Sequence, residues 1–302
     1  MGSRATLVKK KPEGAHYLHG RSGLQAILRP PVDKPASLAW LGNKEVLLVA
    51  TTTGSLVEVD PVMGTRTLCP LGGEVVRLCT DTAGRLFAGF RADGLWCSAS
   101  PGGEGMQEGE HGFTQPLGLF FLGRYLVMFG EVEDGREVAI FADGTERLRR
   151  KIPNKCTVFP GSDGKLWFAR STVRGFECGT LGKRTRFSED APTNHVLIPS
   201  AQGVLGITSH GGVLWSPENG RSESIGLLDI HTGALSADGQ LVGVGTVGGV
   251  VGLVNMQSFE SRKSPFLTKA HDTPIHSVAF AGRGRWLATG ADRVQLWSWD
   301  AI

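Results

Sequence analysis

The chain lacks several features that mark familiar functional classes. It contains no apolar run of about 18 residues, which excludes a membrane-spanning helix, and residues 1–20 lack the apolar core of a secretory signal. Its five cysteines are odd in number and show no CxxC spacing, which favours reduced, buried thiols in a cytoplasmic protein over a metal site. A net charge of +3 is too small to imply nucleic acid by itself. No serine-hydrolase, zinc-protease or phosphate-loop motif appears, so no enzyme is predicted.

The last thirty residues, from His271 to Asp300, carry the most specific pattern. A histidine opens the segment, Val278-Ala-Phe280 and Leu287-Ala-Thr-Gly290 follow, and the segment ends in Trp297-Ser-Trp-Asp300. It resembles one unit of the WD40 repeat family. The resemblance implies a β-propeller, because one unit cannot bury its own faces and several must close into a ring.

The same resemblance implies a structural hydrogen-bonded network of His271, Thr289, Asp292 and Trp297. Asp292 and Trp297 are separated by one residue fewer than is usual in the family, so the turn between them is expected to be tighter.

Six weaker copies precede this unit at intervals of roughly 40 residues, the spacing of propeller blades. Each copy has a first strand, a nearly continuous apolar second strand, a turn that usually contains glycine, a third strand and a more charged fourth strand. Apolar second strands are typical of strands covered on both faces, and charge suits an outer edge. The sequence therefore predicts an all-β, seven-bladed propeller of four-stranded antiparallel blades, with six blades as the alternative. The seven first strands are expected to begin near Ala36, Val75, Leu117, Cys156, His195, Thr232 and Ile275.

The final unit stops after its third strand, at Asp300. The apolar run Gly23–Leu28 is expected to supply the missing fourth strand and to close the ring, which would leave no open edge. This organisation predicts a flexible basic tail over residues 1–21 and a single WD40-like propeller domain over residues 22–302.

Three histidines fall at the same position of consecutive copies, where the first strand starts. In the WD40 family this position faces the mouth of the channel, so the resemblance implies contacts with partners there. The histidines could instead hold a transition metal, or fill the channel mouth as structural polar groups. The partner-binding candidates, with charged residues of nearby turns, are His195, His231, His276, Arg91, Arg174 and His210.

Basic residues also gather on two predicted outer strands. Such a strip could attract phosphate or an acidic partner, although charged outer strands are often only solvated edges. The aromatic residues that interleave with basic ones in single-strand binding proteins are nearly absent. The basic strip consists of Arg147, Arg149, Arg150, Lys151, Lys183, Arg184 and Arg186.

These observations favour a non-enzymatic scaffold that presents the channel mouth to partner proteins in a larger assembly. The alternative is a propeller hydrolase or lyase with a His-lined metal or ligand site at the mouth, and a third hypothesis is a phosphate or nucleic-acid reader that uses the basic strip. No cofactor, metal or catalytic residue is predicted. We expect a cytoplasmic protein that is monomeric on its own, with a small-molecule ligand possible and nucleic acid disfavoured.

Overall fold

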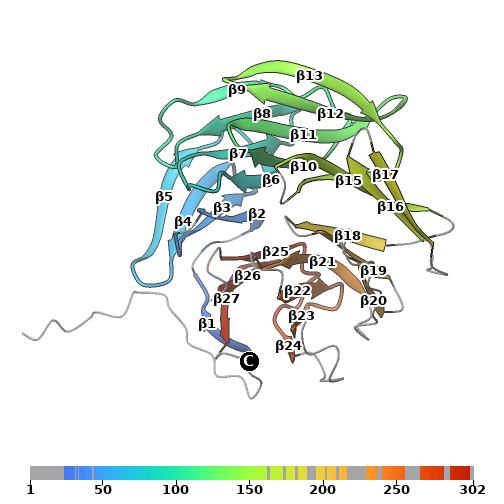
Figure 1. Ribbon diagram of the computed structural model, residues 1–302. Coiled ribbons are helices and arrows are strands. Elements are labelled where there is room, and N and C mark those ends of the chain that lie inside the picture. Colours follow the sequence, from blue (N-terminus) through green and yellow to red (C-terminus); the bar gives the residue numbers. More distant parts are fainter. Residues whose placement is uncertain are drawn as a thin grey trace, which may run out of the picture.

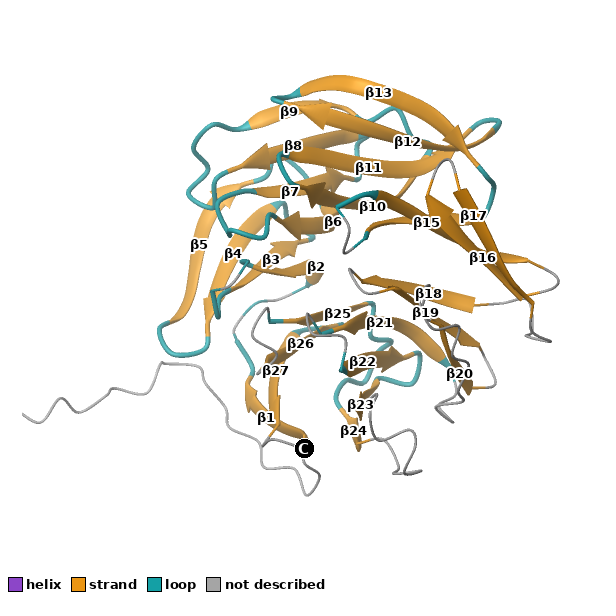
Figure 2. Cartoon of the chain, in the orientation of Figure 1, coloured by secondary structure: helices purple, strands orange, loops and turns teal. Residues whose placement is uncertain are grey.

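A computed structural model places 27 β-strands in seven antiparallel sheets (Figures 1 and 2). It describes residues 24–30, 32, 34–42, 44–161, 164–172, 175–180, 183–188, 195–200, 203–208, 211–215, 229–236, 240–255, 266–281 and 286–299. Every regular element within these ranges is a strand, as the sequence predicts.

Six sheets contain four strands each. The first three are β2 (Pro35–Trp40), β3 (Leu47–Thr51), β4 (Ser55–Asp60) and β5 (Gly64–Pro70); β6 (Val75–Thr80), β7 (Phe87–Arg91), β8 (Leu95–Ala99) and β9 (Gln107–Glu110); and β10 (Gln115–Leu122), β11 (Tyr125–Val132), β12 (Gly135–Ala142) and β13 (Thr145–Ile152). The next two are β14 (Cys156–Pro160), β15 (Leu166–Thr172), β16 (Gly175–Thr180) and β17 (Lys183–Ser188); and β21 (Ile230–Leu235), β22 (Leu241–Thr246), β23 (Val250–Asn255) and β24 (Phe266–Lys269). The last joins β25 (Ser277–Phe280), β26 (Trp286–Gly290) and β27 (Val294–Trp299) with β1 (Leu24–Leu28).

One sheet has three strands within the described residues. It consists of β18 (His195–Ser200), β19 (Gly203–Thr208) and β20 (Gly211–Trp215). The fourth strand expected over residues 223–228 lies outside the described residues. The predicted four-stranded antiparallel blade is therefore present in six sheets, and a seventh blade of four strands is not shown.

The first strand of each sheet lies toward the centre of a propeller, where it contacts the first strands on either side. Contacts run in the order β2, β6, β10, β14, β18, β21, β25 and back to β2 (Figure 1). Val75, Cys156 and His195 begin strands as predicted, and the other four starts differ from the prediction by one or two residues. The propeller architecture predicted from the repeats is confirmed.

The N-terminal strand closes the last sheet as predicted. β1 pairs antiparallel with β27, with Leu24 opposite Trp299 and Ala26 opposite Trp297. The sequence thus places the chain's first and last strands side by side, although they are far apart along the chain. A second tie crosses to the first sheet, where the Trp40 indole N–H donates to the carbonyl of Ala279 at 2.9 Å.

The second strands form the core because both of their faces meet neighbouring sheets. In β3, Leu48 and Ala50 pack toward the β6–β9 sheet, whereas Leu47 and Val49 pack toward the sheet of β25–β27. All five residues of β3 are buried. Alternating side chains of one strand thereby serve two interfaces, which accounts for the nearly continuous apolar second strands in the sequence.

Candidate interaction face

The two ends of the ring carry different turns. In an antiparallel four-stranded sheet, the start of the first strand and the turn between the second and third strands lie at one end. We call this end the mouth face. The opposite face carries the turns between the first and second strands and between the third and fourth strands. All the partner-binding candidates were predicted for the mouth face.

The three mouth histidines lie on consecutive first strands of the ring. His195 is the first residue of β18, His231 is the second residue of β21, and His276 immediately precedes β25. The side chains of His231 and His276 are exposed to solvent. The side chain of His195, and both Arg174 and His210, lie outside the described residues. The backbone thus brings the three positions to one end of neighbouring strands.

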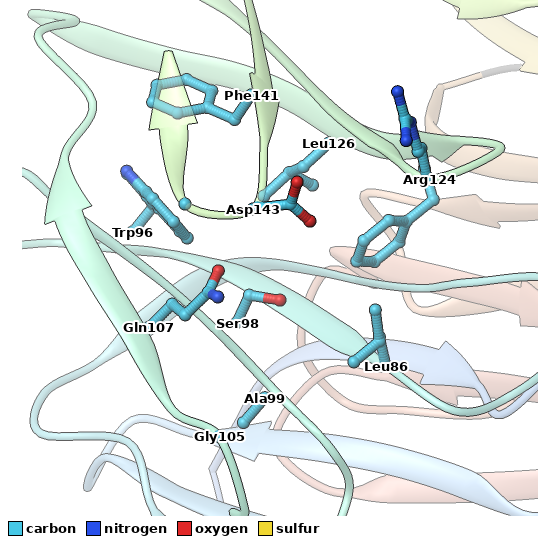
Figure 3. Close-up of a pocket in the computed structure, with 12 residues that line it drawn as sticks. Leu86, Trp96, Ser98, Ala99, Gly105, Gln107, Arg124, Leu126, Phe141 and Asp143 are labelled. Carbon is cyan, nitrogen blue, oxygen red and sulfur yellow. The ribbon is translucent and has the colours of Figure 1, made fainter.

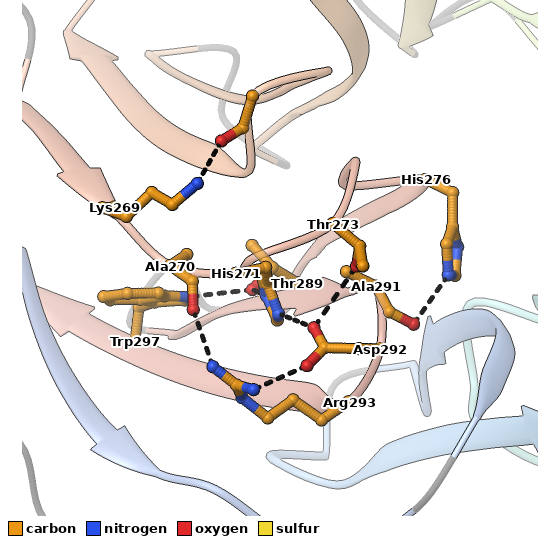
Figure 4. Close-up of polar contacts among 11 residues, drawn as sticks. Lys269, Ala270, His271, Thr273, His276, Thr289, Ala291, Asp292, Arg293 and Trp297 are labelled. Carbon is orange, nitrogen blue, oxygen red and sulfur yellow. Dashed lines mark hydrogen bonds and ion pairs between the residues drawn. The ribbon is translucent and has the colours of Figure 1, made fainter.

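The two histidines with described side chains differ in their backbone geometry and hydrogen bonding. His231 lies at a β-bulge, because the register shifts between the pairs Ile230–Thr246 and Thr232–Gly245. Bulges redirect side chains at the ends of strands. The His276 imidazole donates from Nε2 to the carbonyl of Ala291 at 3.1 Å, in the β26–β27 turn (Figure 4). No hydrogen bond to its Nδ1 is present among the described residues.

Cys156 occupies the equivalent position at the start of β14. Its side chain is fully buried in the core between two sheets. Its carbonyl accepts a hydrogen bond of 2.9 Å from Arg136 Nη1. The described part of the chain contains no group of three or more His, Cys, Asp or Glu side chains placed to hold a metal ion.

The four residues of the expected structural network form one hydrogen-bonded chain (Figure 4). Trp297 Nε1 donates to Thr289 Oγ1 at 3.0 Å, and Thr289 Oγ1 lies 2.9 Å from His271 Nε2. His271 Nδ1 lies 3.1 Å from Asp292 Oδ1. A carboxylate accepts only, so Nδ1 carries the imidazole proton and Nε2 accepts from the threonine hydroxyl. The shorter spacing between Asp292 and Trp297 leaves the chain intact.

Burial and neighbouring charges together set the ionisation states in this network. Burial lowers the pKa of His271 more strongly than the bond to Asp292 raises it. Burial raises the pKa of Asp292, but its bond to His271 and the nearby Arg293 guanidinium outweigh this effect and hold the pKa below its usual range. Arg293 Nη1 donates to Asp292 Oδ2 at 2.6 Å. The network therefore contains a neutral imidazole and an ionised carboxylate at neutral pH.

Arg91 makes a second brace of this kind, in the sheet of β6–β9. The structure places it in the interior, with 8% of the residue exposed. Its Nη2 donates to Asp93 Oδ2 in the β7–β8 turn and to the carbonyl of Gly72, and its Nη1 lies 3.1 Å from Glu108 Oε1. The pKa of Arg91 is raised because these carboxylates outweigh the cost of its burial. The residue joins a turn, an outer strand and the loop before β6.

The other described turns between second and third strands are also held by side chains. Arg136 pairs with Glu131 across the β11–β12 turn at 2.9 Å, and Lys151 pairs with Asp134. In the β3–β4 turn, Thr51 Oγ1 accepts from Ser55 N at 3.1 Å, and in the β22–β23 turn Thr246 Oγ1 accepts from Val250 N at 3.0 Å. Together with the β7–β8 and β26–β27 turns described above, these make five turns of the mouth face. Each is held by side-chain interactions and is therefore fixed before any partner binds.

A second histidine, which the sequence pattern did not identify, lies in a loop equivalent to the one that contains His271. His111 lies between β9 and β10, just as His271 lies between β24 and β25. It is buried, its Nδ1 accepts from Phe113 N at 3.0 Å, and its ring packs edge-on against Phe90. Its Nε2 has no partner among the described residues. The histidine itself was the available signal, but without a Trp-Asp ending nearby the repeat pattern did not select it.

The basic strip is partly neutralised by acidic neighbours. Arg149 pairs with Glu146 at 2.7 Å and Glu137 at 3.5 Å, and Lys151 pairs with Asp134. Two further members on β13, Arg147 and Arg150, are exposed and have no ion-pair partner among the residues described. The remaining members, Lys183, Arg184 and Arg186, lie on β17, and their side chains are outside the description.

Comparison of the sequence with protein-family models and with curated proteins finds no match. Within the described ranges, no helix has the length and apolarity that a membrane span requires. Function is therefore inferred from the fold and from the geometry of the mouth face.

Proposed function

We propose that this protein is a non-enzymatic scaffold whose mouth face binds partner proteins within a larger assembly. Propellers commonly serve such a role, but a fold alone does not specify a function. The observation that carries the proposal is the bracing of all five described turns between second and third strands. A surface whose loops are already ordered loses little conformational entropy on binding, so more of its contact energy appears as affinity.

The contacts that we propose for the partner are the histidines at the starts of β18, β21 and β25. His231 and His276 are exposed beside the braced turns, and a solvent-facing imidazole can donate, accept or stack. Arg174 and His210 remain candidate contacts from the sequence. Because Arg91 is buried and ion-paired, its part in the proposal is to hold the β7–β8 turn in place.

The proposal also covers the number of blades, the family relationship, the cellular location and the oligomeric state. We infer that the sheet of β18–β20 is one of seven blades, since β18 contacts β14 on one side and β21 on the other. We further propose a divergent relationship to the WD40 propellers, supported by the His271–Thr289–Trp297 hydrogen bonds. Cytoplasmic residence and a monomeric free state are also proposed, on the sequence arguments given above.

The test is affinity capture from native lysate with mass spectrometry, comparing the wild type with H195A/H231A/H276A. A matched control is R147A/R150A, which removes two exposed charges from β13, on the outside of the ring. A partner lost in the histidine variant and retained in the control supports the proposal. The reverse result would place the contact on the basic strip.

A metal measurement addresses the enzymatic alternative with the same proteins. Stoichiometric transition metal in purified wild type, absent from the triple histidine variant, would replace the scaffold proposal with a His-lined metal site. Salt titration of any captured complex separates the third hypothesis. Binding through phosphate contacts falls steeply between low and moderate salt, whereas scaffold binding should change little.

A further inference from the structure

A pocket of about 130 Å³ opens on the opposite face of the ring, away from the mouth histidines. It lies between the sheets of β6–β9 and β10–β13 (Figure 3). Its lining comes from the β6–β7, β8–β9, β10–β11 and β12–β13 connections, which lie at this end of the strands, and from residues within strands β8 to β12. It is therefore separate from the proposed partner site.

The pocket has an apolar floor made of core side chains. Trp96, Leu126 and Phe141 are buried where the two sheets meet, and each also lines the pocket. The rings of Trp96 and Phe141 lie 5.3 Å apart between centroids. Because these side chains are held by the inter-sheet core, the floor is rigid.

The polar groups of the pocket include a carboxylate, a hydroxyl and an amide that can both donate and accept. The carboxylate of Asp143, the amide of Gln107 and the hydroxyl of Ser98 face the same space in Figure 3. The Ser98 hydroxyl donates to the carbonyl of Phe87 at 2.9 Å, which leaves its oxygen as an acceptor. No hydrogen bond or ion pair joins Asp143 or Gln107 to another described side chain.

The local backbone holds Asp143 in this position. Asp143 and Gly144 form the two-residue connection between the paired residues Ala142 and Thr145, with φ of 51° and 75°. Asp-Gly is the preferred sequence for such a hairpin turn, since both residues need positive φ. A side chain at position 144 would approach Gln107 Oε1 to 3.2 Å, so glycine also preserves the space around that amide.

Arg124 is the only cationic residue among the described lining residues, and its pKa is raised mainly by Tyr125 and to a smaller degree by the charge of Asp143. Its Nη2 donates to the Tyr125 hydroxyl at 3.3 Å, and its guanidinium carbon lies 5.2 Å from the centre of that ring. In Figure 3 the head group points away from Gln107 and Ser98. Asp143 is the one acidic side chain among the described lining residues, and Arg124 partly offsets its charge from the rim.

One lining side chain is apolar and exposed. Leu86 lines the pocket with 41% of its surface exposed. An exposed apolar side chain beside a concave site can contribute to a binding surface.

We propose that this pocket receives an arginine or lysine side chain from a partner protein, flanked by an apolar residue that covers Leu86. The volume suits one side chain, since a cavity of roughly 150 Å³ accommodates benzene. The aliphatic stem would lie on the floor of Trp96 and Phe141, and the cation would meet acceptors at its end. Charge complementarity to Asp143 selects a basic residue over an acidic or neutral one.

The first test is selection of random heptapeptides displayed on phage against the immobilised full-length protein. We expect enrichment of peptides with one basic residue flanked by an apolar residue. Enrichment of peptides without a basic residue, or recovery of none above background, would overturn the proposal. Replacing the basic residue of a selected peptide by norleucine should weaken binding about tenfold or more, the effect of losing one charge-assisted hydrogen bond.

The second test uses two variants with opposite expected effects on the affinity of the selected peptide, measured by titration calorimetry. D143N should weaken binding about tenfold or more, and Asn accepts the positive φ of this position. R124Q should strengthen binding a few-fold, because it removes a like charge at the rim. An unchanged affinity in D143N, or weaker binding in R124Q, would contradict the proposal.

Two controls separate this inference from the proposed function. D134N makes the same chemical change in the β11–β12 turn on the mouth face and should leave peptide affinity unchanged. The H195A/H231A/H276A variant should also bind the peptide normally. Failure of the pocket proposal would therefore leave the mouth-face proposal intact, and the converse also holds.

Discussion

The hydroxyl of Thr289 offers the sharpest test of the network in the last sheet. The side chain is fully buried and serves two partners at once, as acceptor from Trp297 and as donor to His271. Thr289→Val preserves the shape and volume of the side chain and removes only the hydroxyl. The variant therefore strands an indole N–H and an imidazole nitrogen in a site that water does not reach.

The expected loss in the free energy of unfolding follows from these two groups, which are left without hydrogen-bond partners. An unsatisfied buried donor or acceptor costs about 1–3 kcal/mol, so two predict a loss of about 2–6 kcal/mol in the free energy of unfolding. Thr289→Ser keeps the hydroxyl and removes one methyl group, which should cost about 1 kcal/mol. The prediction is therefore the relative size of the two losses in stability. Thr289→Val should destabilise the protein more than Thr289→Ser, although valine buries more apolar surface than serine.

Equilibrium unfolding in urea measures both variants, with the slope of the transition checked for constancy. A double-mutant cycle with Trp297→Phe should give a coupling energy of about 1 kcal/mol or more, because the two substitutions remove the same bond. If Thr289→Val lost less stability than Thr289→Ser, or if the cycle were additive, the hydroxyl would not stabilise the protein by bonding β26 to β27.

Three further predictions concern closure, a turn and pH. Deleting residues 1–30 removes β1 and should lower the melting temperature of the ring, whereas deleting residues 1–20 should not; equal melting points would refute closure by this strand. Gly249→Ala should cost about 2 kcal/mol or more in urea unfolding, because position 249 has φ of 73° and its new Cβ would meet the carbonyl of His271. Gly248→Ala is the matched control, with only an ordinary contact at 3.8 Å, and should be nearly neutral. Since the pKa of His271 is lowered in the folded state, stability should be complete above about pH 6.5 and fall as pH drops below it, and His271→Gln should reduce that slope.

Much of the architecture could be predicted because it depends on periodicity. The recurring strand and turn pattern located all seven first strands to within two residues, and the apolar run Gly23–Leu28 identified the closing strand. Each of these features needs only an alternation of apolar and turn residues, which one sequence displays directly. The network of His271 was also accessible, since the last repeat carries all four of its residues.

The remaining features depend on pairs that are separated in sequence and follow no repeat. Arg91 looked like a surface charge in a turn, but its partner Glu108 lies seventeen residues further along, on the outer strand. The acidic pocket combines Asp143 with Gln107 across two sheets. No period links such residues, so their meeting depends on the packing of neighbouring blades and is visible only in three dimensions.

The two braces join the same two elements of a blade with different residue types. In the last sheet His271 ties the loop before the first strand to Asp292 in the turn after the second strand. In the sheet of β6–β9 the same two elements are tied in the reverse sense, because Arg91 at the end of the second strand reaches both Asp93 in the turn and the carbonyl of Gly72 in the loop. The mechanical requirement is a polar bridge between loop and turn, and a long guanidinium from one side meets it as well as an imidazole from the other. Because different residue types can form this bridge in different sheets, a search for one residue pattern detects it in the last repeat and not in the sheet of β6–β9.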